Sequence, residues 1–434
     1  MNIFIGILLL CALLGLWDKI SGGKMGLAAE FDGGLASMAS LALSIVGIYC
    51  IGVTAVRSNP EAIASFASWL PFDASVLIGS LLAPDLGGHA IAKELAATPA
   101  LGIYSGVMVS SCLGAMISFT LPIALTVIRR EDTSLFMQGS VWGIVTIPAG
   151  VAVGALLTGL PVKELVCNLL PILLLCVFIC LALIKAAEAT IRVLSVVGNL
   201  VRIASLVLFG LVMLGLFLPA CQIASDTLIF ESLTIVAKIS VVVAGSMVAA
   251  SLILRFFQKG ISRIAGWLGV NSYSVVGLII SLATCISMIP MMEKMDDRGK
   301  VMNAAFAVSG SFVLGGQLAF IASVEPPAVV SAFIAAKLAG GVCAVAAAMA
   351  FAPKSGAGSG EPASLEQENS RLSLPCEDPG GGGRLFCFQG MSQVKSPAGP
   401  AGSNIRITGY SSAFPIKPEG AVRPPYLYCA WCIS

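Results

Sequence analysis

The chain has 434 residues, of which 57% are hydrophobic and only 11% are charged. Soluble proteins carry about 25% charged residues, so this composition excludes an ordinary soluble fold. The formal net charge of +2 gives no support for nucleic acid as a partner.

Apolar stretches recur along residues 1–352, and most are long enough to cross a bilayer core of about 30 Å. The first lacks the basic start and the Ala-x-Ala site of a signal peptide, so we interpret it as a retained segment. We count eleven segments, at residues 2–17, 35–56, 75–92, 101–128, 135–160, 165–184, 203–225, 232–254, 272–292, 301–323 and 326–352. The sequence therefore predicts an all-α polytopic membrane protein.

Segments 75–92 and 272–292 are interrupted in their middle. The first contains Pro84 followed by Gly87 and Gly88, and the second contains Pro290. Non-helical backbone at membrane depth is tolerated only where protein buries it or where it lines a cavity. A pair of interrupted segments is the best sequence pointer to a transporter binding site. We therefore expect two broken or re-entrant segments.

The distribution of Lys and Arg in the loops predicts the orientation. If the two interrupted segments do not cross, nine crossings remain, and fourteen basic residues fall on one side against three on the other. The three are Arg57, Lys93 and Lys163. This asymmetry predicts an N-terminus outside and a C-terminus inside.

The same topology predicts an inverted repeat. Two five-element halves, residues 1–160 and 203–353, are joined by a linker helix within 161–202, whose part 185–202 is amphipathic and suits the membrane surface. Together they form a transporter domain, 1–353. Residues 354–434 are rich in Gly, Pro and Ser, which predicts a disordered cytoplasmic tail.

Asp85 is the strongest candidate for chemistry because it lies within an interrupted segment. A carboxylate at the bilayer centre costs about 2.5–3.5 kcal/mol, so it is paired, hydrated or neutral there. We favour a counter-charge for a cationic substrate. A helix cap at the break is the alternative, and the two roles are compatible.

Four further ionisable residues are candidates for gating or coupling: Glu94, Glu293, Asp296 and Lys337. For the carboxylates, the alternative is an interfacial or solvated position. Lys337 lies deep in an apolar segment and either pairs with a carboxylate or marks an ion path. Asn303, Ser309 and Gln317 lie in one apolar segment and either line a pore or join helices by hydrogen bonds.

No enzyme motif is present. The chain has a single histidine, His89, and lacks a Walker loop, an HExxH motif and a nucleophile elbow. We therefore expect no enzymatic activity, no catalytic residues, no metal site and no cofactor.

Five stretches resemble the ethanolamine-utilisation permease family, EutH, and the resemblance covers about residues 1–353 but not the tail. Two of them are Glu30-Phe31-Asp32-Gly33 and Ala336-Lys337-Leu338-x-Gly340-Gly341. A third surrounds the first break, and a fourth is Gly143-Ile144-Val145-Thr146-Ile147-Pro148. The most specific is Met295-Asp296-x-Arg298-Gly299-Lys300-Val301-x-Asn303-x-Ala305-Phe306-Ala307-Val308-Ser309.

The resemblance implies a permease of the bacterial inner membrane that supplies ethanolamine for catabolism. Asp85 would bind the ammonium group, and Asn303, Ser309 or Gln317 the hydroxyl. The expected partners are ethanolamine and the lipid bilayer, with H⁺ or Na⁺ as the coupling ion and a second copy of the chain as open alternatives. Two rival functions remain: an ion-coupled carrier of another small amine or amino acid, and a non-transporting membrane scaffold or sensor.

Overall fold

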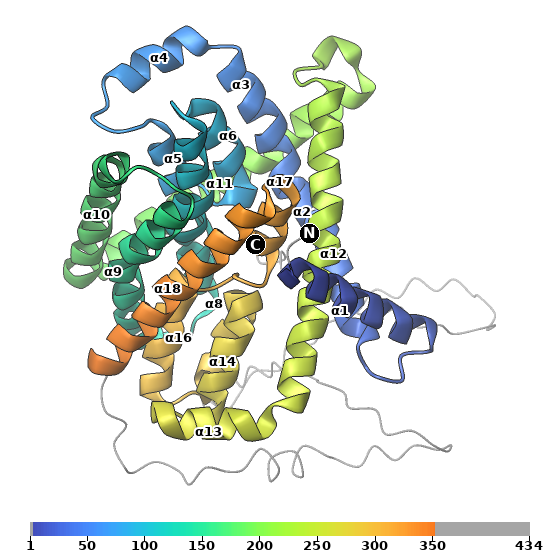
Figure 1. Cartoon of the computed structure of the whole chain (residues 1–434), viewed down its shortest axis with the longest axis vertical. Coiled ribbons are helices and arrows are strands. Elements are labelled where there is room, and N and C mark those ends of the chain that lie inside the picture. Colours follow the sequence, from blue (N-terminus) through green and yellow to red (C-terminus); the bar gives the residue numbers. More distant parts are fainter. Residues whose placement is uncertain (1–2, 352–434) are drawn as a thin grey trace, which may run out of the picture. The chain divides into compact units, whose positions relative to one another are not determined.

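The computed structural model describes residues 3–351, and every secondary-structure element in that part is a helix (Figure 1). This confirms the predicted all-α class. The tail predicted at 354–434 lies outside the described residues.

Eight helices in the described part are long and apolar enough to cross a membrane. Some of these spans are built from consecutive helical pieces. They are α1 (Ile3–Ile20), α2 with η1 and α3 (Ala28–Gly47, Ile48–Gly52, Val53–Arg57), α7 with η3, η4 and α8 (Pro99–Ile103, Tyr104–Gly114, Met116–Thr120, Leu121–Val127), α9 (Thr133–Leu157), α10 (Val162–Lys185), α11 (Ala187–Phe217), α12 (Asp226–Phe256) and α18 (Pro327–Phe351).

The remaining helices are short. Two groups form what we name the first broken hairpin, residues 75–95, and the second broken hairpin, residues 272–294. The first contains α5 (Ser75–Leu81), η2 (Pro84–Leu86) and α6 (Gly88–Leu95), and the second α14 (Ser272–Ala283), α15 (Cys285–Met288) and η6 (Ile289–Lys294). The others are α4 (Pro60–Ser68), η5 (Pro219–Cys221), α13 (Gln258–Leu268), α16 (Asp297–Ser309) and α17 (Gly316–Val324).

Two predicted segments differ from the structure. The stretch 301–323, predicted as one crossing, is divided into α16 and α17, because Gly310, Gly315 and Gly316 disfavour helix and Phe312 adopts a positive φ of 64°. The linker helix predicted at 185–202 is not separate from the next apolar segment, because from Ala187 onward it forms the first part of the continuous helix α11. No proline interrupts that helix, so it runs on into the next apolar segment.

Glycine and alanine contacts hold the long helices together. A methyl group added at Gly34 of α2 would lie 2.2 Å from the Ala244 Cα of α12. On α9, one added at Gly139 would lie 2.2 Å from the Val301 oxygen of α16. Without a hydrophobic force between helices in lipid, such close backbone approach is the main source of packing energy.

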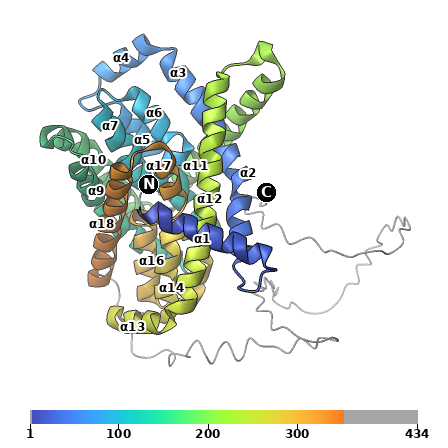
Figure 2. The same ribbon diagram turned by 45° about the vertical axis from the view of Figure 1, so that its right-hand side comes forward.

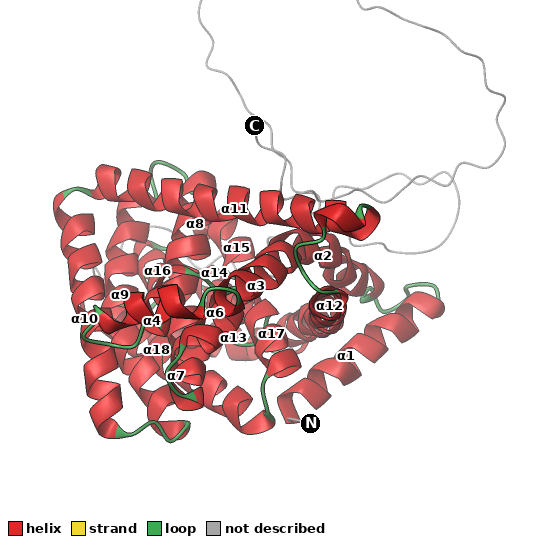
Figure 3. Cartoon of the chain, turned by 90° about the horizontal axis from the view of Figure 1, so that it is seen from above, coloured by secondary structure: helices red, strands yellow, loops and turns green. Residues whose placement is uncertain are grey.

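The helices α1 and α11 run across the others. Seen from above, α12 is viewed end-on while α1 and α11 are seen lengthwise (Figure 3), and the turned view agrees for α1 (Figure 2). Helix α1 packs against α12, and α11 packs against α2. Each crosswise helix therefore packs on the long helix that follows the other one in the chain.

Candidate functional site

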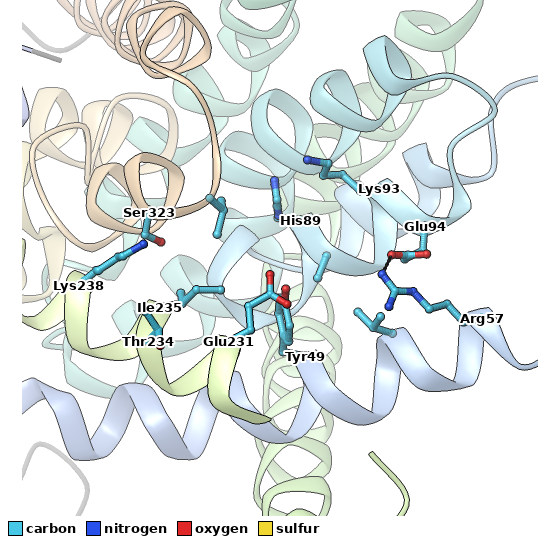
Figure 4. A pocket seen from close by; sticks show the side chains of 13 residues that line it. Tyr49, Arg57, His89, Lys93, Glu94, Glu231, Thr234, Ile235, Lys238 and Ser323 are labelled. Carbon is cyan, nitrogen blue, oxygen red and sulfur yellow. Dashed lines mark hydrogen bonds and ion pairs between the residues drawn. The ribbon is translucent and has the colours of Figure 1, made fainter. Parts of the chain in front are cut away.

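A cavity of about 410 Å³ opens between four elements. We name it the outer pocket, after the side that it would face in the orientation predicted from the sequence. Its walls come from the α2–α3 span, α6 of the first broken hairpin, α12 and α17 (Figure 4). Most of its polar lining residues are ionisable: Tyr49, Arg57, His89, Lys93, Glu94, Glu231 and Lys238. Such a lining suits a small charged ligand rather than an apolar one.

An ion pair and a three-residue cluster tie α6 to its neighbours at this pocket. Arg57 donates to Glu94 at 2.6 Å, which places Glu94, a predicted gating residue, in a cross-helix pair. His89 and Lys93 both contact the same oxygen of Glu325, at 2.7 and 2.8 Å. Glu325 lies in the short connection between α17 and α18, so this second cluster joins the first hairpin to the other half of the chain.

The Glu325 carboxylate is almost fully enclosed, with 4% of its side chain exposed. Burial alone would raise its pKa, but hydrogen bonds and charge from His89 and Lys93 outweigh burial and hold the pKa below the ordinary 4.5. The ring of His89 also meets Phe320 edge-on, with 5.5 Å between ring centroids. A polar and aromatic layer thus lies at the inner wall of the outer pocket.

Glu231 is the carboxylate of this pocket that lacks a cation. Within the described residues no Lys, Arg or His lies within ion-pair distance of it, and it interacts with the Tyr49 hydroxyl (Figure 4). Lys238 follows on the same helix, two turns along, and also lines the pocket. The outer pocket therefore offers one anionic and one cationic side chain that have no ion-pair partner among the described residues.

The first break carries Asp85, four residues before the pocket residue His89. Leu82 and Ala83 are extended, Pro84 begins the short helix η2, and Gly87 has a φ of 86°. A methyl group at Gly87 would lie 2.1 Å from Ile48, so only glycine fits there.

The backbone at the first break is satisfied by serines of the following span. Ser110 donates to the Leu82 oxygen at 2.7 Å, and the Ala83 N–H donates to Ser118 at 3.1 Å. A methyl group at Gly88 would lie 2.4 Å from both the Leu82 oxygen and the Ser110 hydroxyl. Serines thus pair the Leu82 oxygen and the Ala83 N–H, while the Asp85 carboxylate bonds its own backbone N–H.

Asp85 itself is partly buried. In the described part of the chain no cation lies within ion-pair distance of it, and neither η2 nor α6 has a side-chain cap. The carboxylate therefore caps neither helix and bonds only its own backbone N–H, which leaves further acceptor positions for a ligand.

The second break lies at a different place from the predicted one. Helix α14 ends at Ala283, Thr284 is extended, and its hydroxyl caps α15 by accepting from Ile286. Pro290 lies six residues later in η6, at the start of that short helix, where its missing N–H costs no hydrogen bond. The interruption is therefore caused by Thr284, not by Pro290.

The second break also pairs with the unwound residues between α16 and α17. Phe312 donates its N–H to the Ser281 oxygen at 3.0 Å, and Leu314 to the Leu282 oxygen at 2.8 Å. A methyl group at Gly315 would lie 1.8 Å from the Ala283 oxygen. Two unwound segments thus cross in close backbone contact in the second half.

The three hydroxyl-binding candidates are not gathered at one point. Asn303 donates to the Ser274 and Gly299 oxygens and joins α16 to α14. Ser309 is buried beside Thr146, 3.4 Å between hydroxyl oxygens. Gln317 is 4% exposed, and its Oε1 has no partner in the described part of the chain.

The other residues predicted for gating or coupling make ion pairs and hydrogen bonds that join neighbouring elements. Glu293 pairs with Arg129, and Asp296 caps α16 through the Gly299 N–H while accepting from Asn271 and Ser274. Lys337 is 1% exposed and donates to the Ser111 oxygen at 2.9 Å. Within the described residues no group of three His, Cys, Asp or Glu side chains is arranged to hold a metal ion.

The model of the family described as "Ethanolamine utilisation protein, EutH" matches residues 1–351. The chain belongs to the EutH family. A probable ethanolamine permease EutH of Listeria monocytogenes is 36% identical over 352 residues, covering 80% of this chain and 92% of that protein. A probable ethanolamine permease EutH of Salmonella typhimurium is 32% identical, covering 79% of this chain and 88% of that protein.

An uncharacterised Bacillus subtilis protein, YxeR, is also 32% identical, covering 79% of this chain and 92% of that protein. No solved structure is similar to the chain. This EutH chain is a multi-pass membrane protein, as the eight apolar helices among residues 3–351 indicate.

Sequence reasoning missed two residues of the EutH outer pocket region, Glu231 and Glu325. Both lie at the ends of apolar segments, where a carboxylate normally meets water and carries no signal. Two sequence features could have pointed to Glu231. It has no basic residue near it in the sequence, and it shares a helix face with Lys238.

Proposed function

We propose that the chain is an inner-membrane permease for ethanolamine, which is a primary ammonium with a hydroxyl at neutral pH. Membership of the EutH family, in which relatives are named as probable ethanolamine permeases, supports the substrate. The observation that carries the site is Asp85, a partly buried carboxylate in a broken segment with no cation beside it in the described residues.

Asp85 is the proposed partner of the ammonium group. An unpaired carboxylate in a low-dielectric site is costly, and a bound cation removes that cost. The extended Leu82 and Ala83 end α5 just before Asp85, so the negative end of a short helix also points to this region.

Gln317 is the best placed of the proposed hydroxyl partners. It lies in the first turn of α17, and α17 packs against η2, which carries Asp85. Its buried Oε1 lacks a donor among the described residues, and a substrate hydroxyl supplies one. Ser309 and Asn303 lie in α16, not in α17, and are proposed as additional partners of the hydroxyl.

The outer pocket is the proposed entrance, with the cluster of His89, Lys93 and Glu325 as its gate. Glu231 attracts the substrate cation to the pocket. Separation of His89 and Lys93 from Glu325 then admits the cation to Asp85. Glu94 steadies the same helix through Arg57. Glu293 and Asp296 hold the base of the second broken hairpin, which forms the inner gate. The excess of basic residues in the opposite loops supports an N-terminus outside and a C-terminus inside.

An inverted repeat is proposed to connect these gates. Ser75 donates to Asp73 at the base of the first broken hairpin, and Ser274 donates to Asn271 at the base of the second. Each hairpin is followed by a capped helix, with Thr98 and Asp296 as the capping residues. The reciprocal packing of α1 on α12 and α11 on α2 supports the same relationship.

A second candidate function is transport of a small amino acid. Glu231 and Lys238 both line the outer pocket, and neither has an ion-pair partner in the described part of the chain. A zwitterion would engage both groups, whereas ethanolamine engages only the carboxylate.

Uptake of radiolabelled ethanolamine into proteoliposomes tests the function. Saturable uptake above protein-free liposomes, unaffected by excess glycine or serine, supports the ethanolamine permease. Competition by the amino acids would favour the second function, and uptake equal to protein-free liposomes would contradict both.

A further inference from the structure

Lys337 lies near the midpoint of α18 and is the most enclosed cation of the described residues. Its side chain is 1% exposed, and its Nζ donates to the Ser111 oxygen at 2.9 Å. No carboxylate of the described residues lies within ion-pair distance. An ammonium offers three hydrogens, so one carbonyl leaves it far from satisfied.

The elements packed against α18 supply no negatively charged side chain at the level of Lys337. Helix α18 packs on α9, α16, α17 and η3. Of these, α9 and α17 contain no charged residue, and η3 carries only Tyr104 and Cys112 as titratable groups. The charges of α16 are Asp297, Arg298 and Lys300, all in its first turn, at the end away from Ser309. The thiols of Cys112 and Cys285 are the titratable groups that interact with Lys337.

Lys337 also lies beside the crossing of the two unwound segments. Cys285 directly follows the extended Thr284 and interacts with Ser311, which belongs to the other unwound segment. Two helices, α14 and α16, end at this crossing, at Ala283 and Ser309. Helix C-termini carry partial negative charge, and unwound carbonyls of this kind bind Na⁺ or H⁺ in carriers.

We propose that Lys337 is the proton-binding residue that couples transport to H⁺, with its ammonium filling the place of a Na⁺ ion at the crossing. This inference rests on the proposed permease function and names its coupling ion. In each cycle the Nζ–H bond breaks, the electron pair stays on nitrogen, and the proton passes to water on one side. Water on the other side then protonates the amine again.

The contact with Ser111 connects this proton to the first broken hairpin. Ser111 lies in η3, which packs on α5 and α6, and its neighbour Ser110 bonds the Leu82 oxygen at the first break. A neutral amine donates more weakly to the Ser111 oxygen than an ammonium does. Loss of the proton therefore loosens α18 from η3, the element that supports the Asp85 site.

The test uses purified full-length protein in proteoliposomes at zero membrane potential, with protein-free liposomes subtracted. Steady-state accumulation of radiolabelled ethanolamine is measured under pH differences of both polarities and under a Na⁺ gradient. Counterflow without gradients is measured in parallel. The variants are Lys337→Gln, which cannot be charged, Lys337→Arg, which cannot release its proton, and Lys163→Gln as an exposed control.

The expected wild-type result is a change of about threefold or more in accumulation under a pH difference and none under a Na⁺ gradient. Both Lys337 variants lose this response and keep counterflow, while Lys163→Gln behaves as wild type. A pH response retained in Lys337→Arg would overturn the proposal, because it would show that only the hydrogen bond to Ser111 is needed. Accumulation driven by Na⁺, or counterflow lost in Lys337→Gln, would also overturn it. Wild-type counterflow without a pH response overturns the proposal alone, whereas absent counterflow overturns the proposed function as well.

Discussion

The two broken hairpins solve the same backbone problem in different ways. At the first, serine side chains of the next span satisfy the unwound backbone, and an unpaired carboxylate, Asp85, lies in the break. At the second, another unwound segment satisfies it, and no carboxylate lies in the break itself. The nearby ionisable group there is a buried cation, Lys337. In the proposed function, one break receives a cation, whereas the other lies beside a cation of the protein itself.

The largest expected effect is at the first break. Asp85→Asn removes the negative charge while keeping the shape, and loss of a charge-assisted contact of about 2.7 kcal/mol lowers the low-substrate uptake rate about 100-fold. Uptake into proteoliposomes measures this, with exposed Glu61→Gln as the matched control. Uptake by Asp85→Asn within threefold of the wild-type rate would show that the first break does not bind the substrate through its carboxylate.

Added methyl groups test whether both breaks are equally close-packed. Gly88→Ala and Gly315→Ala each force a methyl against a carbonyl oxygen, at 2.4 Å and 1.8 Å, and we expect a loss of about 1–3 kcal/mol in the free energy of unfolding. Gly316→Ala is the control, because nothing lies within 4 Å of its added methyl. Thermal midpoints in detergent measure the difference. Equal midpoints for Gly315→Ala and Gly316→Ala would argue against the backbone crossing.

A smaller effect is expected at the outer pocket. Glu231→Gln removes a free, exposed carboxylate, so substrate attraction weakens by about 1 kcal/mol and KM rises about fivefold with little change in maximal rate. The KM difference shrinks at high salt, where exposed charges are screened. A fall in maximal rate at unchanged KM would instead place Glu231 in the transport step.

The smallest effect concerns acid stability. The pKa of Glu325 is lower in the folded chain than its ordinary 4.5, so its ion pairs stabilise the fold fully above that value. The contribution is lost as pH falls through the lowered folded-state pKa. We expect Glu325→Gln to lower the thermal midpoint at pH 7 and to remove part of the acid-induced decrease seen in wild type. The same acid-induced decrease in both proteins would contradict this.

The sequence predicts the apolar segments and the first break well, since Pro84 and Gly87 act locally on the backbone. It misplaces the second break, because the end of α14 just before Thr284 is fixed by hydrogen bonds from Phe312 and Leu314 to Ser281 and Leu282, contacts distant in sequence. The same is true of Glu325, whose role depends on His89 and Lys93, more than 200 residues earlier. Sequence patterns predict the conformation that a segment adopts from its own residues. They do not predict contacts with a segment that is distant in the sequence.

Equilibrium binding of ethanolamine to the purified protein tests the central claim most directly, because it separates the Asp85 site from every step of transport. Calorimetry on wild type, Glu61→Gln and Asp85→Asn is the measurement. The account predicts one saturable site in the first two proteins and no detectable binding in Asp85→Asn. Binding of wild-type affinity in Asp85→Asn would show that the unpaired carboxylate of the first break is not the ammonium partner.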